Sequence, residues 1–122
     1  MFKNIRSIAI YVSDMERAKK FYVDILGFEI GADIPQANLC FLYSKNKKLS
    51  VYLKAGNNPS KIDNKSSRLS FFLEAEKSIQ ENFHKLKEAG VKILQEKPDQ
   101  VADDTFTFQF LDPDGNILEV VG

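Results

Sequence analysis

The sequence predicts an α+β fold made of two successive modules, each with the element order β-α-β-β-β. Two stretches in which apolar and polar residues alternate, at about residues 5–12 and 68–73, predict the opening strand of each module. Each stretch is followed by a helical pattern that ends at a glycine, Gly27 or Gly90. The same order of elements and stop signals therefore occurs twice in one chain.

The repeat also predicts the domain organisation. A polar stretch with Gly56 and Pro59 separates the two halves and is typical of a linker. At 122 residues the chain has the length of one domain. We expect a single domain over residues 1–122, with these parts: module one at about 4–55, linker at 56–66, module two at about 67–122.

In module one, Ile8, Ile10 and Val12 alternate with more polar or smaller residues and form the expected first strand. Ser13 and Glu16 have the spacing of a capping box, which predicts that Ser13 begins the helix. Five apolar residues of this helix are expected on one face: Met15, Ala18, Tyr22, Ile25 and Leu26. Three more strands are expected at residues 28–32, 39–43 and 49–54, with turns at 33–38 and 44–48.

Module two repeats this order. Its helix is expected to place four residues on one apolar stripe: Ile79, Phe83, Leu86 and Ala89. Strands are then expected at residues 91–95, 105–111 and 117–121, with a loop at 97–104 between the first two.

The last two strands form a predicted hairpin that carries one carboxylate. Asp112 to Gly115 read Asp-Pro-Asp-Gly, in which proline suits the first corner of a turn and glycine supplies the positive φ that returns the chain. Glu119 is the only charged residue of the final strand, and it faces away from Leu118 and Val120 because side chains alternate along a strand. Glu119 therefore faces either solvent or a site.

Composition narrows the possible partners. Seventeen basic residues balance seventeen acidic ones, and they are scattered, which argues against a nucleic-acid groove or a basic membrane surface. The single cysteine, Cys40, argues against a disulfide framework, and the first residues carry no signal-peptide pattern. We expect a cytoplasmic protein with a small-molecule ligand, no nucleic acid and no membrane span.

Two groups of motifs resemble the glyoxalase/bleomycin-resistance/extradiol-dioxygenase superfamily, also called vicinal oxygen chelate proteins. The first is Ile8-Ala-Ile-Tyr-Val-Ser-Asp-Met-Glu-Arg-Ala-Lys-Lys-Phe-Tyr22 with Leu26-Gly-Phe28, and the second is Asp112-Pro-Asp-Gly-Asn with Leu118-Glu119. The resemblance covers nearly the whole chain. It implies that the two modules form a curved half-barrel sheet with a central cleft, and that enzymes of the family bind a divalent metal there.

The four metal-ligand positions implied by the resemblance fall on Ser7, Tyr52, Arg68 and Glu119, of which only Glu119 is a usual ligand. Neutral hydroxyls are weak donors, and an arginine has no lone pair for a cation. We therefore expect no metal and no other cofactor, and an Arg68–Glu119 ion pair at that place. A purely structural ion pair, without any ligand, is the alternative reading of these two residues.

The expected function is a metal-independent, small-molecule-binding protein that holds an antibiotic-like or aromatic ligand in the cleft. The predicted ligand-binding residues are Ser7, Tyr11, Tyr52, Arg68, Phe72 and Glu119. The alternative is a lyase, isomerase or dioxygenase that uses a divalent metal, or Glu119 as general base, which makes Glu119 the one candidate catalytic residue. A structural or regulatory module is the third reading. We expect a homodimer, and we assign no role to His84 or Cys40.

Overall fold

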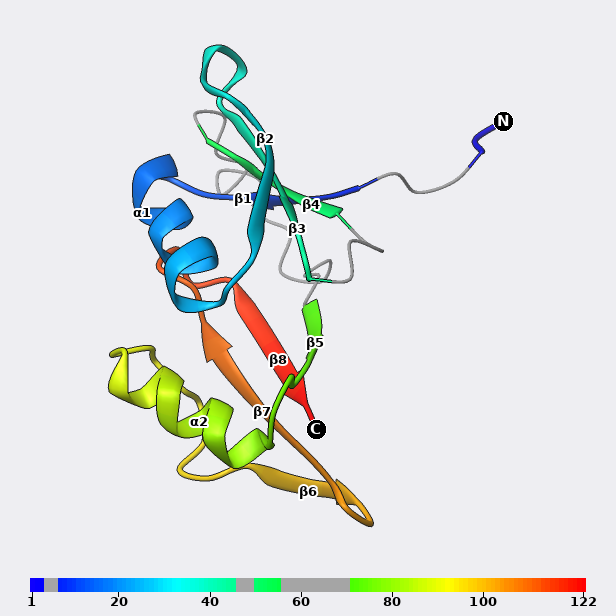
Figure 1. Ribbon diagram of the computed structural model, residues 1–122, viewed down its shortest axis with the longest axis vertical. Helices are drawn as coiled ribbons and strands as arrows, with labels where there is room; N and C mark the ends of the chain where they lie inside the picture. Colours follow the sequence, from blue (N-terminus) through cyan, green and yellow to red (C-terminus); the bar gives the residue numbers. More distant parts are fainter. Residues whose placement is uncertain (4–6, 46–49, 56–70) are drawn as a thin grey trace. The chain divides into compact units, whose positions relative to one another are not determined.

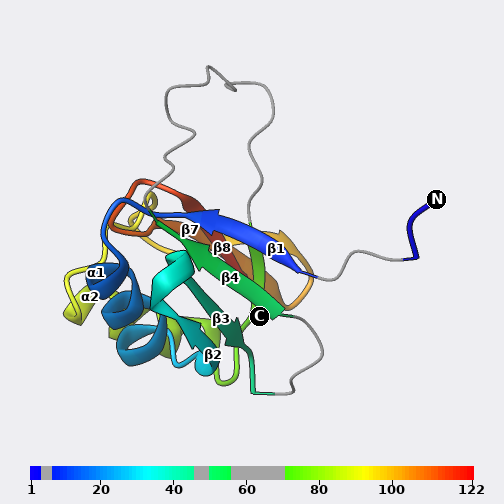
Figure 2. The same cartoon turned by 90° about the horizontal axis from the view of Figure 1, so that it is seen from above.

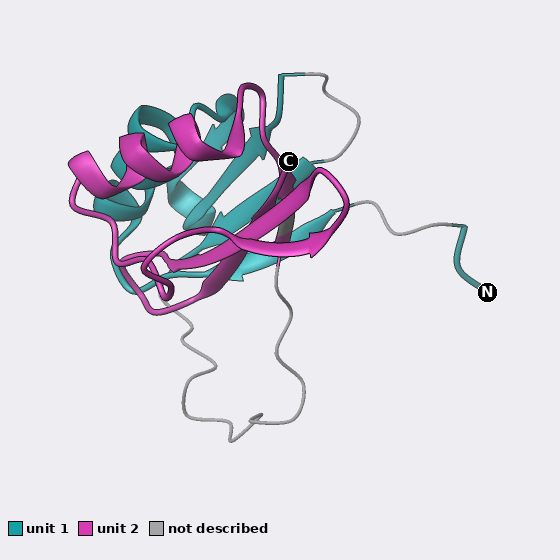
Figure 3. Cartoon of the chain, turned by 90° about the horizontal axis from the view of Figure 1, so that it is seen from below, with its two compact units in different colours: residues 1–63 teal, residues 64–122 magenta. Residues whose placement is uncertain are grey.

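The computed structural model describes residues 1–3, 7–45, 50–55 and 71–122, with the side chain of Phe72 outside this description (Figure 1). The chain divides into two compact units, residues 1–63 and 64–122 (Figure 3). Each unit contains one four-stranded sheet and follows the β-α-β-β-β order, so the predicted α+β fold of two tandem modules is confirmed. The expected linker at 56–66 lies outside the described residues.

Sheet one has the strand order β1-β4-β3-β2, in which β1 and β4 are parallel and the other pairs are antiparallel (Figure 2). The elements of module one are β1 (Ile8–Tyr11), α1 (Met15–Lys19), the π-helical η1 (Lys20–Ile25), β2 (Glu29–Ile34), the 3-10 turn η2 (Pro35–Ala37), β3 (Leu39–Tyr43) and β4 (Ser50–Lys54).

Sheet two has the corresponding order β5-β8-β7-β6, with β5 parallel to β8. The elements of module two are β5 (Phe71–Glu74), α2 (Ile79–Glu88), β6 (Asp99–Ala102), β7 (Thr105–Leu111) and β8 (Ile117–Val121). None of the helices in the described part of the chain is both long and apolar enough to cross a membrane.

Each module buries one face of its sheet and the facing side of its helix. In module one, Leu42 and Leu53 are fully buried with Ala18 and Tyr22 of the helical segment, and α1 contacts β4. In module two, the ring of Phe83 on α2 meets Phe108 on β7 edge-to-face at 5.2 Å between centroids. Burying side chains of this size stabilises the fold by roughly 1.5–3 kcal/mol each. The opposite face of each sheet, which we call its distal face, points away from the helix.

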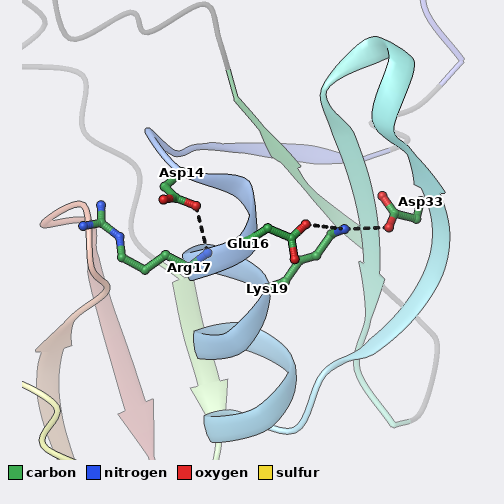
Figure 4. A network of polar contacts seen from close by, with 5 residues as sticks. All are labelled: Asp14, Glu16, Arg17, Lys19 and Asp33. Atoms are coloured by element: carbon green, nitrogen blue, oxygen red, sulfur yellow. Dashed lines mark hydrogen bonds and ion pairs between the residues drawn. The ribbon is translucent and has the colours of Figure 1, made fainter.

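The first helix departs from its predicted form in its N-cap and in its second half. Its N-cap is Asp14 rather than Ser13, because the Asp14 carboxylate accepts a hydrogen bond from the Arg17 backbone N–H at 3.0 Å (Figure 4). After Lys19 the chain continues as a π-helix, whose wider turn shifts the buried face. Phe21 is therefore buried beside Tyr22, whereas Ile25 is 39 % exposed, contrary to the predicted stripe.

Lys19 ties this helix to the edge strand β2. Its ammonium lies 2.6 Å from the Asp33 carboxylate and 3.4 Å from that of Glu16 (Figure 4). The hydrogen bond to Asp33 raises the pKa of Lys19 above its ordinary value. Asp33 belongs to β2, which extends to Ile34, so the predicted end of this strand at residue 32 was too early.

The predicted strand at 91–95 and the predicted loop at 97–104 are both wrong. Residues 92–94 do run beside β7, with hydrogen bonds from Leu111 N to Lys92 O and from Leu94 N to Gln109 O, both 2.9 Å. The pairing then stops, because the side-chain oxygen of Gln95 takes the next backbone donor, Gln109 N, at 2.9 Å. A four-residue strand, β6, resumes the pairing at Asp99, inside the expected loop.

Smaller differences concern element ends. Ala89 is exposed and forms the C-cap of α2, so it leaves the predicted apolar stripe, whereas Ile79, Phe83 and Leu86 are buried as expected. The first strand begins at Ile8, so Ser7 is not part of it, and the predicted start at residue 5 lies outside the described residues. Gly27 and Gly90 have φ of +83° and +79°, which confirms the predicted left-handed helix ends.

Candidate functional site

The β7–β8 hairpin positions Glu119, and its turn is held by one buried carboxylate. Asp112 is 4 % exposed, and its Oδ1 accepts hydrogen bonds from the backbone N–H of Asp114 at 2.9 Å and of Asn116 at 2.8 Å. Its Oδ2 accepts from Asn116 Nδ2 at 2.7 Å. Gly115 has φ of +83°, as the Asp-Pro-Asp-Gly sequence predicts. The turn thereby sets the register in which Glu119 lies.

Glu119 lies at the centre of β8 on the distal face of sheet two. Its neighbours Leu118 and Val120 are 1 % and 5 % exposed and point to the helix side, whereas Glu119 is half-buried on the other side. Across the sheet it pairs with Gln109 of β7 and with Phe72 of β5. The prediction that Glu119 faces away from Leu118 and Val120 is confirmed.

The corresponding part of sheet one is aromatic. Tyr52 of β4 pairs with Ala9 on one side and Phe41 on the other, and the rings of Tyr52 and Phe41 lie 5.3 Å apart. Tyr11 lies two residues after Ala9 on the same distal face and is 44 % exposed. This face can stack on a flat ligand.

Ser7 and Ser50 form the polar end of this face. The hydroxyl of Ser7 donates to the backbone carbonyl of Ser50 at 2.9 Å, and the hydroxyl of Ser50 donates to that of Ser7 at 3.1 Å. The predicted residues Ser7, Tyr11 and Tyr52 are thus brought together at one sheet.

The two sheets place Tyr52 and Glu119 at equivalent positions. Tyr52 pairs with Ala9 in sheet one as Glu119 pairs with Phe72 in sheet two. Arg68, the predicted counterpart of Ser7 in module two, lies outside the described part of the chain, as does the Phe72 side chain. The predicted Arg68–Glu119 pair stays a prediction, and among the described residues none forms an ion pair with Glu119.

The family positions that the structure describes offer two hydroxyls and one carboxylate. Ser7 already uses its hydroxyl in two hydrogen bonds, and Tyr52 offers a neutral phenol. Within residues 1–3, 7–45, 50–55 and 71–122, no three His, Cys, Asp or Glu side chains gather into a possible metal-binding group. Glu119 is the single carboxylate that the family positions supply here.

Sequence reasoning missed Gln95 and Gln109. The signal for Gln109 was present, because Thr105, Thr107 and Gln109 alternate with three phenylalanines and so share the face of Glu119. Gln95 gave no such signal, since its contact with Gln109 joins residues fourteen positions apart.

His84 lies on the surface of its helix, and Cys40 lies in the core of module one. His84 is exposed on α2, and its ring meets that of Phe83 edge-on. Cys40 is fully buried in β3, and burial raises the pKa of its thiol.

Comparison with known proteins agrees with this architecture. A protein of Bacillus subtilis (strain 168) described as uncharacterized protein YetH is 35 % identical over 123 residues, which covers 97 % of each chain. A superfamily member from Sphaerobacter thermophilus shares 28 % identity and a TM-score of 0.76 over 98 % of this chain and 97 % of that one.

TnmS3, an antibiotic binding protein from Streptomyces sp. CB03234, shares 26 % identity and a TM-score of 0.75 over 98 % of this chain and 94 % of its own. Residues 4–120 match the family described as the Glyoxalase/Bleomycin resistance protein/Dioxygenase superfamily. With both modules and the closing hairpin in place, the chain belongs to this superfamily.

Proposed function

We propose that this protein binds a small organic molecule, antibiotic-like or aromatic, without the help of a metal ion. The observation that carries the proposal is the chemistry of the two distal faces. Sheet one presents the Tyr52–Phe41 ring pair, and sheet two presents the half-buried Glu119 at the equivalent position. Aromatic surface with a few polar anchors is typical of small-molecule sites.

The proposed ligand contacts are those of the sequence prediction: Ser7, Tyr11, Tyr52, Arg68, Phe72 and Glu119. In this proposal the tyrosines stack on the flat part of the ligand, Ser7 and Glu119 supply polar contacts, and Arg68 balances the charge of Glu119. The likeness to an antibiotic binding protein over almost the whole chain supports a ligand of this kind.

A thermal-shift screen of antibiotics and aromatic metabolites, run without metal and in the presence of a chelator, tests the proposal. A ligand at a hundred times its Kd stabilises the folded state by about 2.7 kcal/mol. For a chain of this length that corresponds to a rise in Tm on the order of 8 °C. Tyr52→Leu should weaken the shift, whereas Tyr43→Leu, which removes a tyrosine outside the proposed set, should preserve it.

Two results would contradict the proposal. One is a complete screen in which no compound raises Tm. The other is a screen in which stabilisation appears only after a divalent metal is added and disappears with the chelator.

A second candidate is an enzyme in which Glu119 acts as general base, or in which Glu119 helps to hold a divalent metal. The observation in its favour is that no described residue pairs with this carboxylate, so it is available to accept a proton. Elemental analysis after incubation with nickel, zinc, manganese and iron separates the two candidates. One tightly bound equivalent that is lost in Glu119→Ala would favour the enzyme.

We further propose a cytoplasmic homodimer. Light scattering at micromolar concentration should give twice the mass of the 122-residue chain. A monomeric mass at that concentration would contradict the dimer without affecting the proposed ligand.

A further inference from the structure

Gln109 and Glu119 stand side by side on the distal face of sheet two. They are directly opposite each other in the β7–β8 pairing. Phe106 and Gly122 exchange both of their backbone hydrogen bonds, at 2.8 and 3.1 Å, so that pair is hydrogen-bonded. Hydrogen-bonded and non-hydrogen-bonded pairs alternate along an antiparallel ladder, which makes Gln109–Glu119 a non-hydrogen-bonded pair. In such pairs the side chains are closest, with Cα atoms about 4.5 Å apart.

Only one orientation of the Gln109 side-chain amide fits its hydrogen bond with the Gln95 side chain. Its backbone N–H donates to the Gln95 side chain at 2.9 Å, and since an N–H can only donate, the Gln95 atom there is the oxygen. The Gln95 amide nitrogen must then donate, and its two partners are Asp99 Oδ2, at 3.3 Å, and the side chain of Gln109. The Gln109 atom that faces Gln95 is therefore its oxygen, and its NH2 group points elsewhere.

That NH2 group and the Glu119 carboxylate remain available to a ligand. In the described part of the chain neither makes a hydrogen bond, whereas the oxygen of Gln109 is held by Gln95. Gln109, like Glu119, is half-buried and therefore not enclosed. By holding the oxygen of Gln109, Gln95 leaves the NH2 group of Gln109 as a hydrogen-bond donor. This donor lies next to the Glu119 carboxylate, which is an acceptor.

We propose that this donor–acceptor pair recognises the amide edge of a flat lactam or imide, in which N–H and C=O lie side by side. The ligand N–H donates to Glu119, and the ligand C=O accepts from Gln109. A carboxylate ligand is disfavoured because Glu119 repels it, and a ligand without the N–H cannot donate a hydrogen bond to Glu119. This inference rests on the proposed function, in which the ligand contacts the face of Glu119, and it adds the chemical class of the ligand.

The probes are 2-quinolone and N-methyl-2-quinolone, which share the flat rings but differ in the amide N–H. In ¹⁵N-labelled protein, 2-quinolone should shift the side-chain NH2 signals of Gln109, identified by their loss in Gln109→Leu. N-methylation should weaken binding about tenfold, because the Glu119 contact is lost. Gln109→Leu should weaken the binding of both probes, because both lose the contact to their C=O, and Gln100→Leu, which removes an exposed glutamine of β6, should not.

A second variant should reverse which ligand groups the site prefers, from a donor beside an acceptor to two donors. In Gln95→Glu, combined with Asp99→Asn to remove a like-charge contact, both oxygens of residue 95 can only accept. The amide of Gln109 must then turn its NH2 group toward residue 95 and present its oxygen to the ligand. The double variant should lose 2-quinolone binding about tenfold and gain binding of protonated 2-aminoquinoline, which offers two donors, by a similar factor.

The outcomes separate this inference from the proposed function. If both quinolones bind equally and the Gln109 signals stay in place, the donor–acceptor pair is refuted, while ligand binding itself stands. If neither quinolone binds at millimolar concentration, the inference is also refuted, and the wider thermal-shift screen alone decides the proposed function. An unchanged preference in the Gln95→Glu variant would refute the role of Gln95.

Discussion

Replacement of Asp112 by alanine should destabilise the protein more than any other single change in the β7–β8 turn. Its carboxylate is 4 % exposed and accepts three hydrogen bonds of 2.7–2.9 Å, two from backbone N–H groups and one from the Asn116 side chain. Hydrogen bonds to a charged group contribute about 1.5–3 kcal/mol each. Asp114 and Asn116 are half-exposed, so water replaces part of the loss. We expect a decrease in the free energy of unfolding of about 3 kcal/mol.

A pair of exchanges tests the reason for this loss. In Asp112→Asn the amide oxygen can still accept from both backbone donors, but its NH2 group opposes the NH2 group of Asn116. This variant should lose about 1–2 kcal/mol. Adding Asn116→Asp places a carboxylate opposite the new amide and should restore much of that loss, as coupled neighbours do in a double-mutant cycle.

Urea unfolding measures how far the free energy of unfolding of each of the three variants differs from that of the parent. Unfolding is followed by circular dichroism and by tyrosine fluorescence, because the chain contains no tryptophan. Asp112→Ala should lower the urea concentration at the midpoint of unfolding without changing the slope of the free energy against urea concentration. Its Tm should fall by roughly 10 °C. If Asp112→Ala unfolds at the same urea concentration as the parent, the buried carboxylate does not hold the turn. Independent effects of the two exchanges would show that the Asp112–Asn116 contact is not formed.

Three further predictions concern module one. Because the hydrogen bond to Asp33 raises the pKa of Lys19, the ion pair contributes fully below the ordinary lysine pKa of 10.5 and is lost as the pH rises through the higher folded value. Lys19→Met should therefore cost about 0.5–1 kcal/mol at pH 7 and progressively less in urea titrations at more alkaline pH, and a constant difference would contradict this. A Cβ at Gly31 would lie 1.9 Å from Cε2 of Tyr43, so Gly31→Ala must displace the ring and should cost about 1–2 kcal/mol, which an unchanged urea midpoint would disprove. The buried Cys40 thiol, whose pKa burial raises, should react with a disulfide reagent at least about a hundredfold more slowly in the native protein than in concentrated guanidinium chloride, and equal rates would argue against its burial.

The local sequence pattern was sufficient to predict the bounds of an element wherever one face of the element is buried and a turn sets its ends. The strands Leu39–Tyr43, Thr105–Leu111 and Ile117–Val121 have the predicted bounds. In each of them the buried residues alternate with half-exposed ones over most of the strand, which is the signal that sequence periodicity reads.

The local sequence pattern was insufficient to predict a helix cap or a buried position where two residues could each occupy it. Ser13 and Asp14 are both good N-caps, and the one whose side chain reaches the Arg17 N–H became the cap. The π-helical turn after Lys19 likewise has no periodic signal, because it adds one residue to a helix and exchanges Phe21 for Ile25 on the buried face.

The sequence by itself determined that two β-α-β-β-β modules follow one another, that a tight turn precedes the last strand, and that Glu119 faces away from the apolar side of that strand. These properties depend on neighbours only a few residues apart. The tertiary structure alone decided which side chains accompany Glu119 on sheet two. Gln109 reaches it through strand pairing, and Gln95 replaces a backbone partner of Gln109 from fourteen residues away, a contact for which no local period exists.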